Sequence, residues 1–407
     1  MLKMEHGRIH IAIPLMDELE NLPQLLNDIR AQDADDYRVY FCVNQPDVWW
    51  KNEEKRSVCE RNLQSMDFIK DHADFPAKII DRCSRGKGWQ GNNLGVGWAR
   101  KVAMDAVQEE ANDRDIIITL DGDTRFNAGY FSSIKTNFNE HNTAVGLSVP
   151  YYHKLSGSEP EDRAILRYEI YMRNYAINLW RIGNPYRFTA LGSAMAMPVS
   201  SYRAIGGMTP KKSGEDFYFL QKLVKYGELL TWNEEKVYPA ARFSDRVFFG
   251  TGPAMIKGNR GDWDSYPVYH HRLFEEVKQT YDAFPALYRE DIKTPLGEYL
   301  SGKTGRKKIW EPLRKNAPDE KIFIKACREK IDGLRILQFL KHSQGERGYS
   351  DEECLLANIR ILHAGILNDF DFLVDGFTFD ELSVGQLDKL RDALVAIEEA
   401  YQKEHHG

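Results

Sequence analysis

Asp115-Ile116-Ile117-Ile118-Thr119-Leu120-Asp121-Gly122-Asp123-Thr124 is a short apolar run that ends in two aspartates separated by one glycine. β-Branched residues in an unbroken apolar run of this length are typical of a strand that is covered on both faces. In α/β sheets, ligands bind beyond the carboxyl ends of the strands. The stretch therefore predicts a buried strand that places Asp121 and Asp123 at the edge of a sheet where a ligand binds.

The two aspartates are candidate metal ligands. Two carboxylates this close together attract a divalent cation such as Mg²⁺ or Mn²⁺, which typically links one or two carboxylates to the phosphates of a substrate. The alternative is a strand followed by a polar turn, because Asp-Gly is also a common turn pair. Asp-x-Asp alone does not decide between these two interpretations.

Length, charge and cysteine usage limit the class of protein. The chain has 407 residues, of which 42% are hydrophobic, and this length predicts two domains. A formal net charge of -6 gives no reason to expect a nucleic acid partner. Five scattered cysteines without a Cys-x-x-Cys pair favour reduced thiols over a disulfide framework or structural zinc.

Neither a secretion signal nor a transmembrane segment is expected. Residues 1–7 are polar, and the apolar run at residues 9–15 is too short for a signal peptide. No apolar run approaches the ~20 residues that span a bilayer. We therefore expect a soluble, cytoplasmic protein.

The N-terminal region alternates strand and helix patterns. Strands are predicted at residues 8–14, 39–43 and 77–81, and helices at residues 22–29 and 59–69. Strand, helix and strand at this spacing form a βαβ unit, so a parallel sheet with right-handed crossovers is expected. The predicted fold class is α/β with a Rossmann-like sheet.

A glycine-rich loop at residues 82–97 leads into the next predicted helix. It contains a G-x-G-x-x-G match that starts at Gly86, but the dinucleotide fingerprint belongs to the first strand-to-helix turn and needs an acid after the next strand. We interpret the loop as flexible backbone that brings Arg85, Lys87 and Arg100 toward an anionic ligand. The alternative is that these three side chains are ordinary solvated charges.

Beyond the two aspartates, the pattern is less regular. A helix with aromatic residues is predicted at residues 164–180, and its aromatic stripe is more often core than a sugar platform. A strand is predicted at residues 189–197, and a helix at residues 217–226 begins just after Asp216. Arg242 and Arg246 then lie in a glycine-containing loop that could fold over a diphosphate.

Several motifs follow one another along the chain: Ile11-Ala12-Ile13-Pro14 with Asn21-Leu22, Gly95-x-Gly97-x-Ala99-Arg100, Asp121-Gly122-Asp123, and Ile205-Gly206-Gly207-Met208 followed by Gly214-Glu215-Asp216. In this order and spacing, over about the first 250 residues, the chain resembles the family 2 glycosyltransferases of the GT-A fold, which use nucleotide-diphosphate sugars. The resemblance implies a nucleotide-sugar-binding sheet with helices on both faces.

The resemblance also implies roles for residues near the donor. Pro14 and Asn44 are expected near the nucleotide, and Asp123 is expected to bind the metal with Asp121 beside it. The second strand ends Val43-Asn44-Gln45 where many relatives have acids, which leaves the nucleotide base open. No Gln-x-x-Arg-Trp signature of processive polymerases is found, which favours a single-addition transferase.

The catalytic base implied by the resemblance is Asp216 of the Glu215-Asp216 pair. From its position alone, Asp216 lies at a helix start, so plain capping of the helix is the alternative. Glu215 is the other candidate for the base. The direction of any shift in the pKa of Asp216 is not settled by the sequence, since a helix N-terminus stabilises the charged form while Glu215 and burial disfavour it.

After residue 262 helical patterns dominate, at residues 321–339, 351–367 and 386–401. We therefore expect a catalytic domain at residues 1–262 and an α-helical domain at residues 263–407.

The C-terminal region contains two further motifs. Residues 297–304 match G-x-x-x-x-G-K-[ST], but no apolar strand precedes them, so the P-loop match is expected to be accidental. Residues 303–315 carry six basic residues against one acid. They form either a solvated turn or a peripheral contact for an anionic membrane surface or acceptor.

Together these patterns predict an enzyme that moves a sugar from a nucleotide-sugar donor to a hydroxyl of a glycan, lipid-linked or small-molecule acceptor, with inversion. Mg²⁺ or Mn²⁺ is the expected cofactor. One alternative is a synthase that joins the sugar to a small acid such as glycerate. Another is a non-catalytic relative that binds sugar nucleotides. The joint presence of Asp121, Asp123 and Asp216 favours an enzyme, because a binding module does not need a base.

Overall fold

The computed structural model describes residues 5–91, 94–211, 214–244, 250–362 and 370–406. The chain forms two compact units: unit 1, with Met1–Ile165, Phe188–Asn259 and Gln402–Gly407, and unit 2, with Leu166–Arg187 and Arg260–Tyr401. The domain boundary expected after residue 262 stays a prediction. Residues 166–187 belong to the same compact unit as the C-terminal helices.

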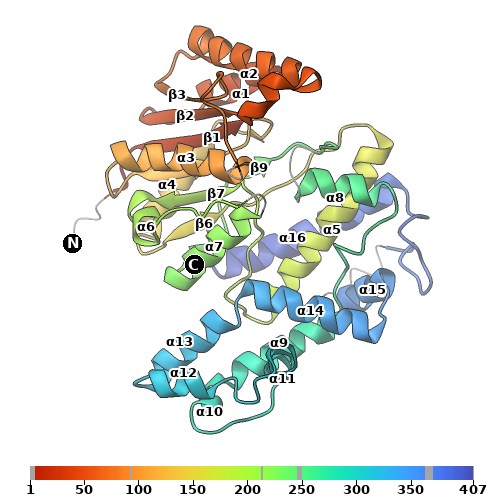
Figure 1. Ribbon diagram of the computed structural model, residues 1–407. Coiled ribbons are helices and arrows are strands. Elements are labelled where there is room, and N and C mark those ends of the chain that lie inside the picture. Colours follow the sequence, from red (N-terminus) through yellow and green to blue (C-terminus); the bar gives the residue numbers. More distant parts are fainter. Residues whose placement is uncertain (1–4, 92–93, 212–213, 245–249, 363–369, 407) are drawn as a thin grey trace. The chain divides into compact units, whose positions relative to one another are not determined.

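Within the described residues, seven strands of unit 1 form one sheet in the order β3-β2-β1-β4-β7-β6-β8 (Figure 1). Their bounds are β1 (Ile9–Leu15), β2 (Tyr37–Asn44), β3 (Ala77–Arg82), β4 (Ile116–Thr119), β6 (Gly146–Ser148), β7 (Met195–Pro198) and β8 (Leu229–Leu230). The predicted α/β class, with a central sheet flanked by helices and a helical C-terminal region, is confirmed.

The strand direction differs in part from the expectation. Strands β3, β2, β1 and β4 are parallel as predicted, but β7 runs antiparallel to both β4 and β6. The prediction of a fully parallel sheet is therefore wrong. The physical reason is that the apolar pattern of a strand reports its burial and not its direction, and mixed sheets with antiparallel strands are common.

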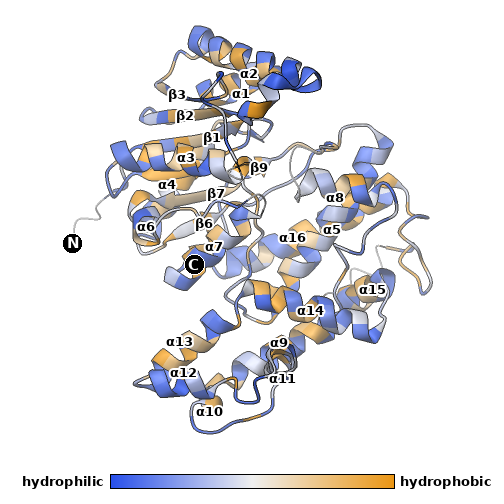
Figure 2. Ribbon diagram, viewed as in Figure 1, coloured by the Kyte–Doolittle hydropathy of each residue, from blue (hydrophilic) through white to orange (hydrophobic). Residues whose placement is uncertain are grey.

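Helices of unit 1 pack against this sheet, with α3 against β1 and β2 and α7 against β6 and β8. The bounds in and around unit 1 are η1 (Leu19–Asn21), α1 (Leu22–Arg30), η2 (Asp47–Lys51), α2 (Glu53–His72), α3 (Val96–Glu110), α4 (Tyr130–Glu140), α6 (Val199–Ala204), α7 (Glu215–Tyr226) and α8 (Thr251–Gly258). Strands β5 (Arg125–Phe126) and β9 (Val237–Tyr238) form a separate antiparallel pair. Helix α2 carries many hydrophilic residues (Figure 2).

The C-terminal region is helical, and α5 and α16 each have residues in both units. The bounds are α5 (Glu159–Arg181), α9 (His271–Asp282), α10 (Phe284–Leu287), α11 (Pro295–Thr304), α12 (Glu311–Asn316), α13 (Glu320–Lys330), α14 (Gly333–Arg347), α15 (Asp351–Leu362) and α16 (Val384–Glu404). The helical pattern predicted at residues 321–339 is divided between α13 and α14, because Asp332 accepts a hydrogen bond from the Arg335 N–H and starts α14. Residues 363–367 of another predicted helix lie outside the described residues.

The P-loop match at residues 297–304 lies inside helix α11. The Thr294 hydroxyl caps this helix by accepting from the Gly297 N–H. Because a P-loop needs free backbone N–H groups, the match is accidental, as predicted. The basic residues that follow include Lys308 and Lys315, which pair with Glu311. Of the helices that the structure describes, none has the length and apolarity needed to cross a bilayer.

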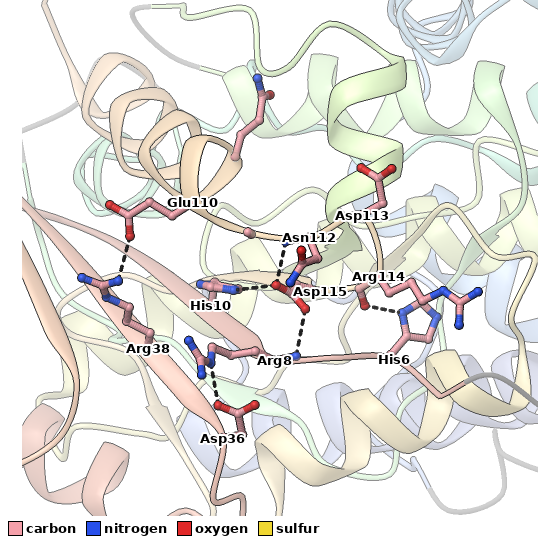
Figure 3. Close-up of polar contacts among 12 residues, drawn as sticks. His6, Arg8, His10, Asp36, Arg38, Glu110, Asn112, Asp113, Arg114 and Asp115 are labelled. Carbon is pink, nitrogen blue, oxygen red and sulfur yellow. Dashed lines mark hydrogen bonds and ion pairs between the residues drawn. The ribbon is translucent and has the colours of Figure 1, made fainter.

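A buried carboxylate fixes β1 against β4 at the edge of the sheet opposite the predicted site (Figure 3). Asp115 accepts hydrogen bonds from the backbone N–H groups of Arg8 (3.0 Å) and Asn112 (2.8 Å), one at each oxygen. The Nε2 atom of His10 lies 3.2 Å from the same side chain. Burial lowers the pKa of His10, although Asp115 acts in the opposite direction, so the imidazole is neutral at pH 7.

We predict that Asp115→Asn destabilises the protein by about 1–3 kcal/mol, because an amide presents one N–H₂ group to a backbone donor and leaves that donor unpaired. Urea unfolding measures the change. The control is Asp113→Asn in the same turn, since the Asp113 side chain is 70% exposed and its loss should change stability little. Equal effects of the two substitutions would contradict the assignment.

Candidate active site

The guanidinium of Arg100 is the centre of the site. Arg100 lies on α3, is 2% exposed, and its three nitrogens contact protein atoms. Nη2 donates to Asp121 Oδ1 at 2.9 Å, Nε to Glu215 Oε1 at 3.3 Å, and Nη1 to the Gly192 carbonyl at 2.8 Å. A buried charge needs such partners, because an unpaired one costs several kcal/mol. Arg100 therefore joins the end of β4 to the start of α7.

Two glycines allow these close approaches. A Cβ atom at Gly192 would collide with the Arg100 guanidinium. At Gly122 it would lie 2.7 Å from Leu15 Cδ2 and 3.0 Å from Glu18 Cγ, at the end of β1. A side chain between the two aspartates would therefore force Leu15 and Glu18 to shift. The strand predicted at residues 189–197 is shortened to β7 because the Gly192 carbonyl accepts from Arg100 and from the Thr119 hydroxyl instead of a strand neighbour.

Asp123 contacts a second arginine. Arg242 Nη2 lies 2.5 Å from Asp123 Oδ2 and 2.7 Å from Glu18 Oε1. Glu18 follows β1 and was missed by the sequence analysis, although an acid shortly after a parallel strand was the available signal. Arg246, predicted beside Arg242, lies outside the described residues.

Asp216 has an unusual environment at the start of α7. One of its oxygens accepts from the Phe217 N–H at 2.7 Å. Burial, followed by the neighbouring carboxylate of Glu215, raises the pKa of Asp216 to about 7, while Phe217 and Arg100 act in the opposite direction. A carboxyl group with such a pKa can take up and release a proton near neutral pH.

Among the described residues, acids outnumber bases at the site. The acids are Glu18, Asp121, Asp123, Glu215 and Asp216, and the bases are Arg100 and Arg242. An excess of carboxylates disfavours the approach of an anion and favours a cation. This charge distribution is what a site needs if an anionic ligand enters together with a metal ion.

The donor atoms fit such an ion. Asp121 and Asp123 supply hard carboxylate oxygens, and the Asp121 side chain is 35% exposed. No cluster of three or more His, Cys, Asp or Glu side chains within the described residues forms a complete metal-binding set. Mg²⁺ and Mn²⁺ commonly use one or two carboxylates and complete their shell with waters and phosphates. The chemistry of the two aspartates therefore fits a divalent cation whose remaining ligands are not protein side chains.

The residues expected near the nucleotide lie at the same edge of the sheet. Pro14 is buried in β1, and Asn44 is buried at the end of β2. The Asn44 amide donates to the Leu15 carbonyl at 2.9 Å and accepts from Trp89 Nε1 at 2.9 Å. Asn44 thus fixes the glycine-rich loop to the ends of β1 and β2.

The three basic side chains that were predicted to approach an anionic ligand do not lie together. Arg100 is buried in the site. Lys87 is exposed and pairs with Asp81 at 2.9 Å, and Arg85 is exposed with its guanidinium 5.0 Å from the centre of the Trp50 ring. The structure therefore does not bring Arg85 and Lys87 into contact with the carboxylates of the site, and their role toward a donor stays a prediction.

We predict that, as the pH rises, the free energy of unfolding of the native protein falls relative to that of the Asp216→Asn variant. The raised pKa means that the folded chain holds a proton on Asp216 that the unfolded chain loses near its ordinary pKa of ~4. Stability from this group is complete below pH ~4 and is lost as the pH rises toward about 7. Unfolding free energies at pH 4 to 8 measure the difference. A difference that is constant over this range would contradict the raised pKa.

No family model matches the sequence, and no curated protein matches it. Among solved structures, S. aureus TarS 1-349 in complex with UDP-GlcNAc is 13% identical with a TM-score of 0.41, over 93% of this chain and 98% of that chain. S. aureus TarS is 12% identical with a TM-score of 0.40 over 80% of this chain, and the match spans about half of that chain (55%). The mannosyltransferase PcManGT from Pyrobaculum calidifontis, in complex with GDP-Man and Mn²⁺, is 12% identical with a TM-score of 0.36 over 98% and 89% of the two chains.

Proposed function

We propose that this chain is a metal-dependent glycosyltransferase that moves a sugar from a nucleotide-diphosphate donor to a hydroxyl acceptor in a single, inverting displacement. One observation carries the proposal. The buried Arg100 guanidinium joins Asp121, from the end of β4, to Glu215, which lies beside a carboxyl group with a pKa of about 7. A cation-binding carboxylate and a proton acceptor are thereby held in one rigid arrangement.

In this proposal, Asp121 and Asp123 hold the diphosphate end of the donor. A bound Mg²⁺ or Mn²⁺ would supply charge stabilisation to the diphosphate as it leaves, which is worth several kcal/mol. Arg100 keeps Asp121 in place through its hydrogen bond, and we assign it a positioning role because it is 2% exposed and bonds to three protein acceptors. Pro14 and Asn44 are proposed to border the nucleotide.

Asp216 acts as the general base. It accepts the proton of the attacking acceptor hydroxyl while that oxygen bonds to the anomeric carbon and the diphosphate departs from the opposite face. A pKa of about 7 suits this role, because the ideal base titrates near the working pH. Glu215 is buried, bonds to Arg100 and contributes to the raised pKa of its neighbour, so we assign it a positioning role.

A donor screen tests the proposal. UDP- and GDP-sugars are incubated with the protein with and without Mn²⁺, and release of the nucleotide diphosphate is measured. Asp123→Asn should abolish metal-dependent release and metal-dependent donor binding without unfolding the protein. The control is Asp36→Asn, which changes an exposed carboxylate that pairs with Arg8 beside the start of β1. Release that is insensitive to EDTA and to Asp123→Asn would refute the metal role.

We further predict that Asp216→Asn lowers kcat by roughly 10²- to 10⁴-fold with little change in donor affinity, because base catalysis contributes about this much. In the native protein, kcat should rise with pH up to about 7, since the base must be deprotonated. Steady-state kinetics from pH 5 to 9 and the anomeric configuration of the product provide the measurement. Near-native turnover in Asp216→Asn, with Glu215→Gln inactive, would transfer the role to Glu215. A retained configuration would exclude the single displacement.

A further inference from the structure

We propose that Arg242 is the internal counter-ion of the metal site, and that it exchanges with the divalent cation when the donor binds. The inference rests on the proposed function. It adds a coupling: the metal binds weakly to the protein alone and strongly together with a nucleotide diphosphate.

The geometry places the arginine on a predicted metal ligand. Arg242 Nη2 lies 2.5 Å from Asp123 Oδ2 and 2.7 Å from Glu18 Oε1. Asp123 and Glu18 are mostly buried, so their charges are poorly screened by solvent. One guanidinium nitrogen therefore occupies a position beside the carboxylate oxygen that a cation would approach.

A metal ion and the guanidinium on the same carboxylate would repel each other. Like charges within about 4 Å repel, and the repulsion is larger in a partly buried site than in water. Binding of a metal to Asp123 therefore favours displacement of the guanidinium, and the energy of its two ion pairs opposes that step. Metal affinity without a donor is lowered by this competition.

The displaced guanidinium has spare hydrogen-bonding capacity. Arg242 Nε is buried and has no hydrogen-bond partner among the described residues. Guanidinium groups match phosphate oxygens with two parallel N–H donors, and diphosphate brings such oxygens with the metal. Transfer of Arg242 from Asp123 to the diphosphate replaces the lost ion pair. Each ligand then improves the affinity for the other by the same factor, as linkage requires.

The test is a binding cycle with Mn²⁺ as the metal and UDP or GDP as the diphosphate, with no turnover involved. Electron paramagnetic resonance measures Mn²⁺ affinity with and without nucleotide, corrected for the metal–nucleotide complex in solution. In the native protein, nucleotide should tighten Mn²⁺ binding strongly. In Arg242→Ala, Mn²⁺ should bind roughly tenfold tighter without nucleotide, and most of the coupling should disappear. Arg242→Lys should restore part of the coupling.

The control is Arg61→Ala. Arg61 is 37% exposed, close to the 34% of Arg242, and it pairs with Asp17, the neighbour of Glu18. Arg61→Ala should bind Mn²⁺ with the affinity of the native protein, both with and without nucleotide. If Arg242→Ala binds Mn²⁺ as the native protein does, or more weakly, without nucleotide, the exchange is refuted while the metal role stands. If neither protein binds Mn²⁺ even with nucleotide, the proposed metal role fails, and the exchange fails with it.

Discussion

The burial of one guanidinium organises the catalytic unit. Arg100 on α3 can be buried only because three acceptors meet it, from the end of β4, the start of α7 and the Gly192 carbonyl. Loss of one partner of a buried charge typically costs about 3–5 kcal/mol, so the three segments are constrained together. The carboxylates of the site are thereby placed by the fold itself, before any ligand binds.

This constraint holds the carboxylates of the site close together, where their negative charges repel one another. Five acidic side chains share two guanidinium groups among the described residues, and the charge of Glu215 adds to burial, the larger cause, in raising the pKa of Asp216. Sites commonly sacrifice stability for function in this way. Cations relieve the repulsion, while protonation of Asp216 relieves part of it. The excess of negative charge therefore supports the proposed metal role, and together with burial it supports the proposed base role.

Much of this arrangement could be predicted from residue patterns. The apolar run before Asp121 indicated a buried strand, and the parallel order of β1 to β4 follows from the βαβ spacing. The antiparallel β7 could not be predicted, because burial patterns carry no direction. Likewise, the ion pairs of Arg242 with Glu18 and Asp123 join residues far apart in sequence, and only the folded chain brings them together. The protein acceptors of Arg100 could not be predicted either, and its role toward an anionic ligand stays a prediction.

The central claim is that Asp121 and Asp123 hold a divalent cation together with a nucleotide diphosphate. The most direct measurement is anomalous X-ray scattering from crystals grown with Mn²⁺ and UDP or GDP. The account predicts a manganese peak bonded to a carboxylate of this pair and to the diphosphate, with Arg242 moved off Asp123. A manganese peak elsewhere, or a bound nucleotide with Arg242 still paired to Asp123 and no manganese, would contradict it.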